Sequence, residues 1–138
     1  MHATITAETW LAEADPDGGH AARWLRAARL VVLPLGRRWC AVMAPAHDGL
    51  AAAAGVQGPT IHDPVGRSVF FLVPVATPWA DDLGTRLLGE GHWLTVPSPS
   101  VLEPPGSYWI SPPDGSGLLV DPVRLHAALA ARHSGGRS

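Results

Sequence analysis

TIHDPVGRSVFFLVPV, residues 60–75, predicts a β-hairpin near the middle of the chain. Two apolar runs, Thr60–His62 and Ser68–Val75, flank the turn-forming segment Asp63–Arg67, whose length suits the connection of two antiparallel strands. Phe70 and Phe71 are neighbours in the second run, and neighbouring residues of a strand face opposite ways. Because both are apolar, we expect the second strand to be central and covered on both faces.

Four more apolar runs predict strands on either side of this hairpin. Upstream, Leu30–Leu35 and Trp39–Ala44 are separated by a short Gly-Arg-Arg segment, which favours a pair of strands. Downstream, His92–Val96 and Ser107–Ser111 are joined by the proline-rich loop Pro97–Pro105. The strands together predict a mixed or antiparallel sheet.

Helical spacing or capping residues predict helices over residues 6–13, 20–30, 49–54, 78–88 and 122–133. In the second of these segments Trp24 and other apolar residues recur on one face, and Arg23, Arg26 and Arg29 fall on the opposite face. This pattern is typical of an amphipathic helix with an arginine stripe.

Capping residues support three of the other helices. Asp48 is expected to cap the third helix, and Asp121 the last. Pro78, with Asp81 and Asp82 in the first turn, is typical of a helix start. We therefore expect helices to flank the sheet.

Length and composition indicate one α+β domain. The chain has 138 residues, which suffice for one ordinary core and not for two comfortable domains. A hydrophobic fraction of 46%, only 16% charged residues and six tryptophans favour a packed globule. We expect this single domain to cover residues 1–133 and residues 134–138 to be a disordered tail.

The residue types and segments that are missing from the sequence suggest where the protein is located in the cell and what kind of organism encodes it. No apolar run approaches the roughly 20 residues of a membrane span, and the N-terminus does not resemble a signal peptide. Cys40 is the only cysteine, which suits a reducing compartment, and we expect it to be buried beside Trp39. All ten basic residues are arginine, as in proteins of a high-GC bacterium. The expected location is the cytoplasm, without membrane contact.

GHWLTVPS, residues 91–98, and GSYW, residues 106–109, combine glycines and aromatic residues with an apolar strand and a Pro-Ser turn. They resemble the late signature of the bifunctional DNA primase/polymerase (prim-pol) N-terminal domain family. VVLPLGRRW, residues 31–39, and GRSVFF, residues 66–71, are similar to earlier parts of that domain. The resemblance covers about residues 20–112 and implies an RRM-like core.

The resemblance also implies which positions polymerase chemistry would need. Nucleotidyl transfer uses two metal ions roughly 3.5–4 Å apart, held by carboxylates that the family carries on the strand of its first motif. Here that strand, Trp39–Ala44, reads WCAVMA and has no acid. A further family Asp aligns with Thr85, and the family's His aligns with Ser68 or Val69. We therefore expect a degenerate member that is not an active polymerase, with no metal and no cofactor.

Five residues of the resembling segments are candidate ligand contacts: Arg67, Ser68, Ser98, Tyr108 and Trp109. The turn before the second hairpin strand offers backbone amides and one guanidinium to an anion, although a plain hairpin turn explains it as well.

Aromatic and basic residues raise the possibility of nucleic-acid binding. Arg23, Arg26 and Arg29 are the candidate nucleic-acid contacts, with a solvated helix face as the competing interpretation. Among the aromatic residues Trp93 is expected to point into the core, whereas Tyr108 is a candidate for exposure.

Two His-Asp dipeptides, at residues 47–48 and 62–63, are candidate general bases or metal ligands. Asp48 is equally explained as a helix cap and Asp63 as a turn residue. If the protein is an enzyme, we expect His62, Asp63 and His92 to carry protons.

Three functions follow from these observations. The first is a non-catalytic, prim-pol-like regulatory module that binds a nucleotide, a single-stranded nucleic acid or a protein partner. The second is an enzyme of specialised metabolism that converts a small molecule in a repurposed, Trp-lined cleft. The third is a structural or oligomeric role, for instance in a homodimer.

Overall fold

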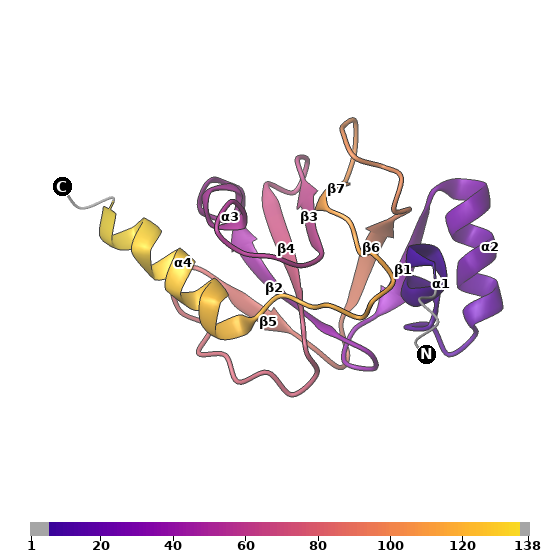
Figure 1. Ribbon diagram of the computed structural model, residues 1–138, viewed down its shortest axis with the longest axis horizontal. Helices are drawn as coiled ribbons and strands as arrows, with labels where there is room; N and C mark the ends of the chain where they lie inside the picture. Colours follow the sequence, from indigo (N-terminus) through magenta and orange to yellow (C-terminus); the bar gives the residue numbers. More distant parts are fainter. Residues whose placement is uncertain (1–5, 136–138) are drawn as a thin grey trace.

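Four helices and seven strands make up residues 6–135, the part of the chain that the computed structural model describes (Figure 1). The helices are α1 (Ala7–Ala12), α2 (Gly18–Ala28), α3 (Ala46–Ala53) and α4 (Pro122–Gly135). The strands are β1 (Leu30–Pro34), β2 (Cys40–Pro45), β3 (Thr60–Asp63), β4 (Ser68–Val73), β5 (Arg86–Leu88), β6 (Trp93–Pro97) and β7 (Tyr108–Ser111). The predicted α+β class is confirmed.

The larger sheet, here called sheet B, has five antiparallel strands in the order β5-β2-β4-β3-β7. Its strands β3 and β4 form the predicted hairpin, with Ile61 opposite Phe70. The central strand is β4, as predicted: Phe71 is fully buried on one face, and Phe70 packs against the core on the other. The path β2-α3-β3-β4-β5 follows the β-α-β-β-α-β pattern, with a loop in place of the second helix.

The strands β1 and β2 do not pair with each other, contrary to the prediction. Instead β1 pairs with β6 to form a two-stranded sheet, here called sheet A, whereas β2 pairs with β4 and β5. The burial pattern of each strand explains the difference. Exposed and buried residues alternate along the first four positions of β1, so only one face of it suits a core, whereas β2 is apolar on both faces and suits the interior of sheet B.

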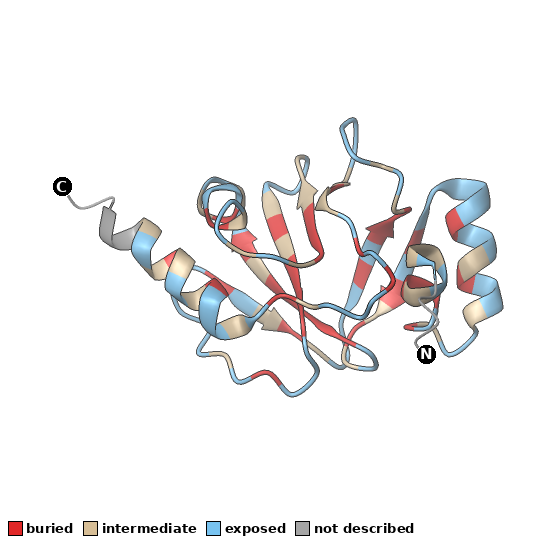
Figure 2. Ribbon diagram, viewed as in Figure 1, coloured by how far each residue is buried: buried red, intermediate tan, exposed pale blue. Residues whose placement is uncertain are grey.

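Two hydrophobic clusters cover the two faces of sheet B (Figure 2). The first lies between sheet B and the layer formed by sheet A, α1 and α2, and it includes Leu25, Leu33, Leu72 and Trp109. The second lies under α3 and α4 and includes Phe71, Leu125 and Leu129. The protein is therefore a stack in which sheet B is covered on both sides.

Residues 78–85 form a loop, and β5 follows directly, where the sequence predicted one helix over 78–88. Asp81 and Leu83 have φ values of 54° and 57°, which a right-handed helix excludes. Trp79 Nε1 donates to Thr85 Oγ1 at 2.9 Å, and Leu87 N–H donates to Asp81 Oδ1 at 2.8 Å. Pairing of β5 with β2 thus outweighs the local helix signal.

Helix boundaries differ from the prediction at several places. The second helix, α2, spans Gly18–Ala28 where the sequence predicted residues 20–30, because the chain turns at Arg29 and Leu30 begins β1. Asp48 lies in the first turn of α3 and does not cap it, because the helix begins directly after β2. The last helix extends to Gly135, past the predicted start of the tail, and residues 136–138 of that tail lie outside the described residues. Asp121 behaves as predicted, since its Oδ1 accepts from Val123 N–H at 2.9 Å.

Within residues 6–135, no helix combines the length and the apolar character that crossing a membrane requires. Cys40 is buried, as predicted. Burial raises the pKa of the Cys40 thiol above its ordinary value, so the thiolate is disfavoured at neutral pH and this residue is a poor nucleophile.

Candidate functional site

The three predicted proton carriers are spread over two sheets. His62 lies on β3, where its Nδ1 is 2.8 Å from the Tyr108 hydroxyl oxygen on β7. Asp63 Oδ1 accepts from Gly66 N–H at 3.0 Å, which is the turn role that competed with catalysis. His92 is exposed and precedes β6 in sheet A. The structure therefore pairs His62 with Tyr108 and not with His92.

The other His-Asp dipeptide joins two helices. His47 Nε2 contacts the Arg132 guanidinium on α4, and Arg132 Nε lies 3.6 Å from Asp48 Oδ1. These contacts link the start of α3 to α4, which explains the dipeptide without catalysis.

Two predicted ligand contacts lie in the core. Ser98 is 6% exposed, and its Oγ donates to Leu25 O at 3.0 Å. Trp109 is 1% exposed, and its Nε1 donates to Pro97 O at 2.8 Å. Both side chains hold the segment after β6 against α2 and β7, so neither is placed to touch a ligand.

The remaining predicted contacts occupy the hairpin and its neighbour β7. Arg67 is exposed in the turn at φ 53°, and its carbonyl accepts from Ala46 N–H at 2.9 Å. Ser68 Oγ donates to Gly66 O at 3.1 Å. Tyr108 is half-buried, and its ring meets that of His62 edge-on at a centroid distance of 5.2 Å. These contacts are those of a closed turn and a cross-strand pair.

The strand that would carry the polymerase carboxylates is β2, next to the centre of sheet B. Ala41 and Met43 face the first hydrophobic cluster, and Cys40, Val42 and Ala44 belong to the second. In the part of the chain that the structure describes, no group of three His, Cys, Asp or Glu side chains is placed to hold a metal ion. The position that the resemblance assigns to two metals is filled by apolar packing.

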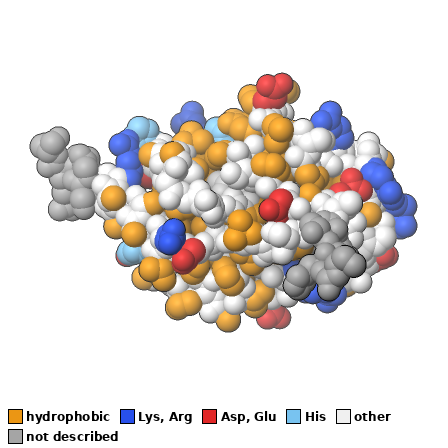
Figure 3. Space-filling model, viewed as in Figure 1, with side chains coloured by type: hydrophobic (Ala, Val, Ile, Leu, Met, Phe, Trp, Pro, Cys, Tyr) orange, Lys and Arg blue, Asp and Glu red, His pale blue; other side chains and the backbone are white. Residues whose placement is uncertain are grey.

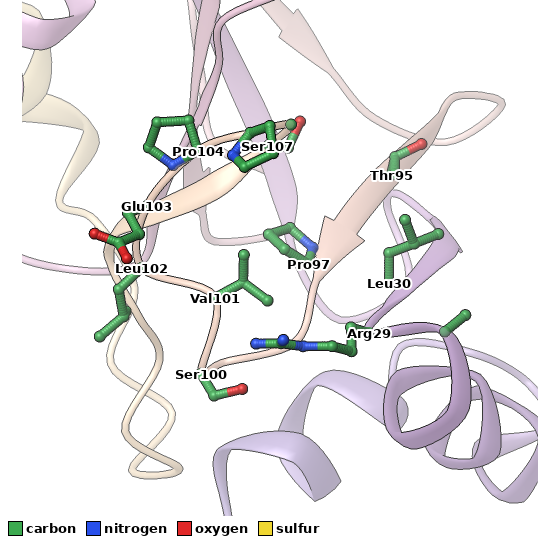
Figure 4. A pocket seen from close by; sticks show the side chains of 13 residues that line it. Arg29, Leu30, Thr95, Pro97, Ser100, Val101, Leu102, Glu103, Pro104 and Ser107 are labelled. Carbon is green, nitrogen blue, oxygen red and sulfur yellow. The ribbon is translucent and has the colours of Figure 1, made fainter.

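A cavity of about 470 Å³ lies on the outer face of sheet A, the face turned away from the core. The end of α2, the first residue of β1 and two residues of β6 form one side of it, and the loop after β6 forms the other (Figure 4). Its lining residues are Ala28, Arg29, Leu30, Thr95, Pro97, Ser100, Val101, Leu102, Glu103, Pro104, Pro105, Gly106 and Ser107.

Two charged residues line this cavity, Arg29 and Glu103. Figure 4 shows the Arg29 guanidinium extending toward Ser100 and Val101, whereas the carboxylate of Glu103 points to the other side of the loop. The structure shows no ion pair to Arg29 within residues 6–135. An exposed guanidinium without an ion pair, beside a mixed polar and apolar lining, suits a ligand that combines an anionic group with an apolar body.

The backbone of Arg29 is strained. It ends α2 in the left-handed conformation with φ 62°, a position at which glycine is usual. A residue with a Cβ gives up about 1–2 kcal/mol there. The turn sends the chain from α2 into β1, and the Arg29 carbonyl accepts from Ser98 N–H at 2.8 Å.

The predicted arginine stripe is divided in the structure. Arg23 and Arg26 lie on the exposed side of α2, and Arg26 Nε is 4.0 Å from Glu8 Oε1. Figure 3 shows acidic side chains among the basic ones at this end of the molecule. Arg29 alone of the three lines the cavity, so the stripe is not one continuous basic surface.

Apolar side chains continue from the cavity along the outer face of sheet A. Leu30, Val32 and Trp93 are 44%, 49% and 63% exposed. Trp93 was predicted to face the core, but Leu94 and Val96 take that side of β6. The signal for exposure was present in the sequence, because Trp93 and the polar Thr95 must share one face of a strand.

A second site was missed by sequence reasoning. His126 Nε2 lies 3.0 and 3.1 Å from the two carboxylate oxygens of Asp82, and the Trp79 ring meets the imidazole edge-on at 5.5 Å. Trp79, His126, Val123 and nearby residues line a shallow cavity of about 610 Å³. The loop and α4 are far apart in sequence, so no local pattern could reveal this contact.

Comparison with known protein families, curated proteins and solved structures finds no match to this chain. The resemblance to prim-pol domains therefore stays a prediction that rests on the quoted motifs.

Proposed function

We propose that this protein is a non-catalytic, prim-pol-like binding module whose ligand site is the cavity and outer face of sheet A. The ligand is a nucleotide, a nucleic acid or a protein segment that presents an anionic group to Arg29. The observation that supports this most directly is Arg29, which has a left-handed backbone, no ion pair among the described residues, and a side chain in a cavity next to exposed apolar residues.

Strain at a binding residue has a physical rationale. A backbone in an unfavourable conformation persists only where the surrounding structure holds it, and such residues cluster at ligand sites. Glycine at position 29 would make the same turn without strain. Arginine there places a guanidinium in the cavity, which glycine does not supply.

The absence of turnover is inferred from β2. Two divalent cations beside a triphosphate require carboxylates, and β2 offers sulfur, aliphatic and methyl groups only. If the ligand is a nucleotide, the module therefore binds it without magnesium-dependent nucleotidyl transfer.

A second candidate function is conversion of a small apolar metabolite at the Trp79 cavity. One observation favours it: Asp82 holds the imidazole of His126 beside Trp79 at the edge of that cavity. In many enzymes a carboxylate fixes the tautomer of a histidine that transfers protons. This arrangement takes the place of His62, Asp63 and His92 in the enzyme alternative.

Thermal-shift and calorimetric titrations separate these proposals. The probes are ATP with and without Mg²⁺, a single-stranded oligothymidylate and a peptide with a free C-terminal carboxylate. A ligand that binds the folded state raises Tm by mass action. We expect one probe class to stabilise the protein and Arg29→Asn to weaken that binding by about tenfold or more, the cost of one charge-assisted contact.

Asparagine tolerates the left-handed conformation, so this variant removes the charge without adding strain. Arg23→Asn, on the exposed side of the same helix, is the matched control and should bind as the wild type does. Equal loss in both variants would contradict a specific role of Arg29. Stabilisation that requires Mg²⁺ together with ATP would contradict the inference from β2.

A further inference from the structure

We propose that His20 is a pH-sensitive switch that holds the Trp24 indole while its imidazole is neutral and releases the indole when the imidazole is protonated. Both residues lie on α2, and neither lines the cavity at Arg29, so the inference is independent of the proposed function. It follows from a chain of two hydrogen bonds in which His20 stands between Asp15 and Trp24.

The contacts of His20 fix one tautomer of its neutral ring. Trp24 Nε1 lies 2.9 Å from His20 Nε2, and an indole nitrogen only donates, so Nε2 is the acceptor. A neutral imidazole then carries its one N–H on Nδ1, which lies 3.3 Å from Asp15 Oδ2 and donates to it. The bond to Trp24 therefore requires the neutral ring, whereas the bond to Asp15 does not.

Asp15 anchors the imidazole in both protonation states. Asp17 N–H donates to Asp15 Oδ1 at 2.8 Å, and Asp17 Oδ1 accepts from His20 N–H at 3.0 Å as the cap of α2. The Asp15 side chain is only 16% exposed, so the carboxylate is held in place beside the ring. A second proton on the ring turns the Nδ1 contact into a charge-assisted hydrogen bond and keeps His20 on Asp15.

Protonation reverses the contact on the other side of the ring. Nε2 then carries a hydrogen that points at the Trp24 N–H, and two donors face each other without an acceptor. The two rings meet edge-on at a centroid distance of 6.2 Å, and the edge of an aromatic ring is its positive part. Because the imidazolium is repelled in this orientation and Trp24 is 49% exposed, the indole turns away into solvent.

The other charged groups around His20 leave Asp15 as its partner. Glu8 Oε1 lies 4.0 Å from Arg26 Nε, and among the described residues the carboxylate in an ion pair with His20 is that of Asp15. The charged residues of the elements packed around His20 are Asp15 and Asp17 in the turn before α2, Arg23 and Arg26 on α2, Glu8 and Glu13 on α1, and Arg38, which donates to the Glu13 carbonyl.

Release of Trp24 changes what α2 presents to solvent. With His20 neutral, the indole N–H is bonded within the helix. With His20 protonated, both this donor and the ring are free for other contacts. Histidine ordinarily changes charge between about pH 5 and pH 8, so the change falls in the weakly acidic to neutral range.

Indole ¹⁵N–¹H spectra from about pH 8 to about pH 5 test the proposal, with the Trp24 signal assigned by its loss in Trp24→Phe. We expect the Nε1 proton of Trp24 to shift upfield in a single-proton step, because its hydrogen bond is lost. The Cε1 proton of His20 should titrate with the same midpoint.

Two variants serve as controls. His20→Gln keeps an acceptor for the indole but does not take up a proton, so its Trp24 signal should not respond to pH in this range. His92→Gln, at an exposed histidine before β6, should titrate as the wild type does.

A Trp24 signal that stays in place while His20 titrates would overturn the proposal. An equal Trp24 response in His20→Gln would overturn it too, because another group would then cause the shift. The imidazole ¹⁵N signals at about pH 8 give an independent check. They should show the neutral tautomer with its proton on Nδ1, and a proton on Nε2 would contradict the bond from Trp24.

Discussion

Arg29 combines a left-handed backbone with a side chain that faces a cavity, and the two properties can be separated experimentally. Arg29→Gly relieves the strain and removes the charge. We expect the free energy of unfolding to rise by about 0.5–1 kcal/mol, since relief of strain exceeds the entropy cost of glycine. Urea denaturation measures the change, and binding to the peptide or nucleotide probe should be lost at the same time.

Arg67→Gly provides the control for that experiment, because Arg67 has φ 53° in the hairpin turn and does not line the cavity. It should stabilise the protein by a similar amount and leave binding intact. Destabilisation by Arg29→Gly would contradict the strain assigned to its backbone, and loss of binding in Arg67→Gly would contradict the placement of the ligand at Arg29.

Gly49 in α3 is a residue at which helix propensity and packing oppose each other. A Cβ there would lie 2.6 Å from Val69 Cβ on β4, closer than real Cβ atoms approach one another. We expect Gly49→Ala to lower the free energy of unfolding by about 1–3 kcal/mol, although alanine is the better helix former.

Thermal or urea unfolding of Gly49→Ala should be compared with Gly55→Ala, where the added Cβ meets only Ala52 O at 3.7 Å. The second variant should stay within about 0.5 kcal/mol of the wild type. A stabilised Gly49→Ala would mean that α3 is not held against β4 as closely as described.

At the scale of elements, the loop before β5 is held to α4 by Asp82 and His126. Both side chains are nearly half exposed, so solvent screens the pair. A double-mutant cycle of Asp82→Asn and His126→Gln should give a coupling energy of about 0.2–1 kcal/mol in urea unfolding. The more exposed pair of Arg124 and Asp121 should give a smaller coupling.

A coupling near zero for Asp82 and His126 would mean that the edge contact with Trp79 holds the loop without the carboxylate. The enzyme alternative would then lose its support, because the imidazole would not be oriented by Asp82.

Element types and element partners were predictable to different degrees. The hairpin of β3 and β4 follows from alternation and turn residues close together in sequence. The pairing of β1 with β6 joins segments about 60 residues apart. The sequence indicates it only through the fact that each of the two strands is suited to burial on one face. The loop at residues 78–85 carries a good helix start, and tertiary pairing of β5 overrides it.

At the scale of the whole molecule, the predicted α+β class is correct, because composition and periodicity together leave few other fold classes possible. The site was less predictable. Arg29 was among the predicted contacts, but it was predicted as one of three residues of the arginine stripe and not as a residue that lines a cavity. Ser98 and Trp109 were chosen from a motif, and the core uses both. A sequence pattern shows which residues can bind, whereas burial decides which of them reach solvent.

The stack of layers leaves little of sheet B exposed. One of its faces is covered by α3 and α4 and the other by sheet A with α1 and α2 (Figure 1). The outer face of sheet A is left as the exposed apolar sheet surface in the described part of the chain. The proposed ligand site lies on this exposed face.

The indole ¹⁵N–¹H spectrum tests this placement most directly, because the tryptophans report on separate layers. We would titrate the labelled protein with the probe that raises Tm most. The Trp93 signal should shift with saturation in the wild type and not in Arg29→Asn, while the buried Trp39 and Trp109 signals stay in place. A saturable shift of Trp79 with Trp93 unmoved would contradict the account and place the ligand beside His126.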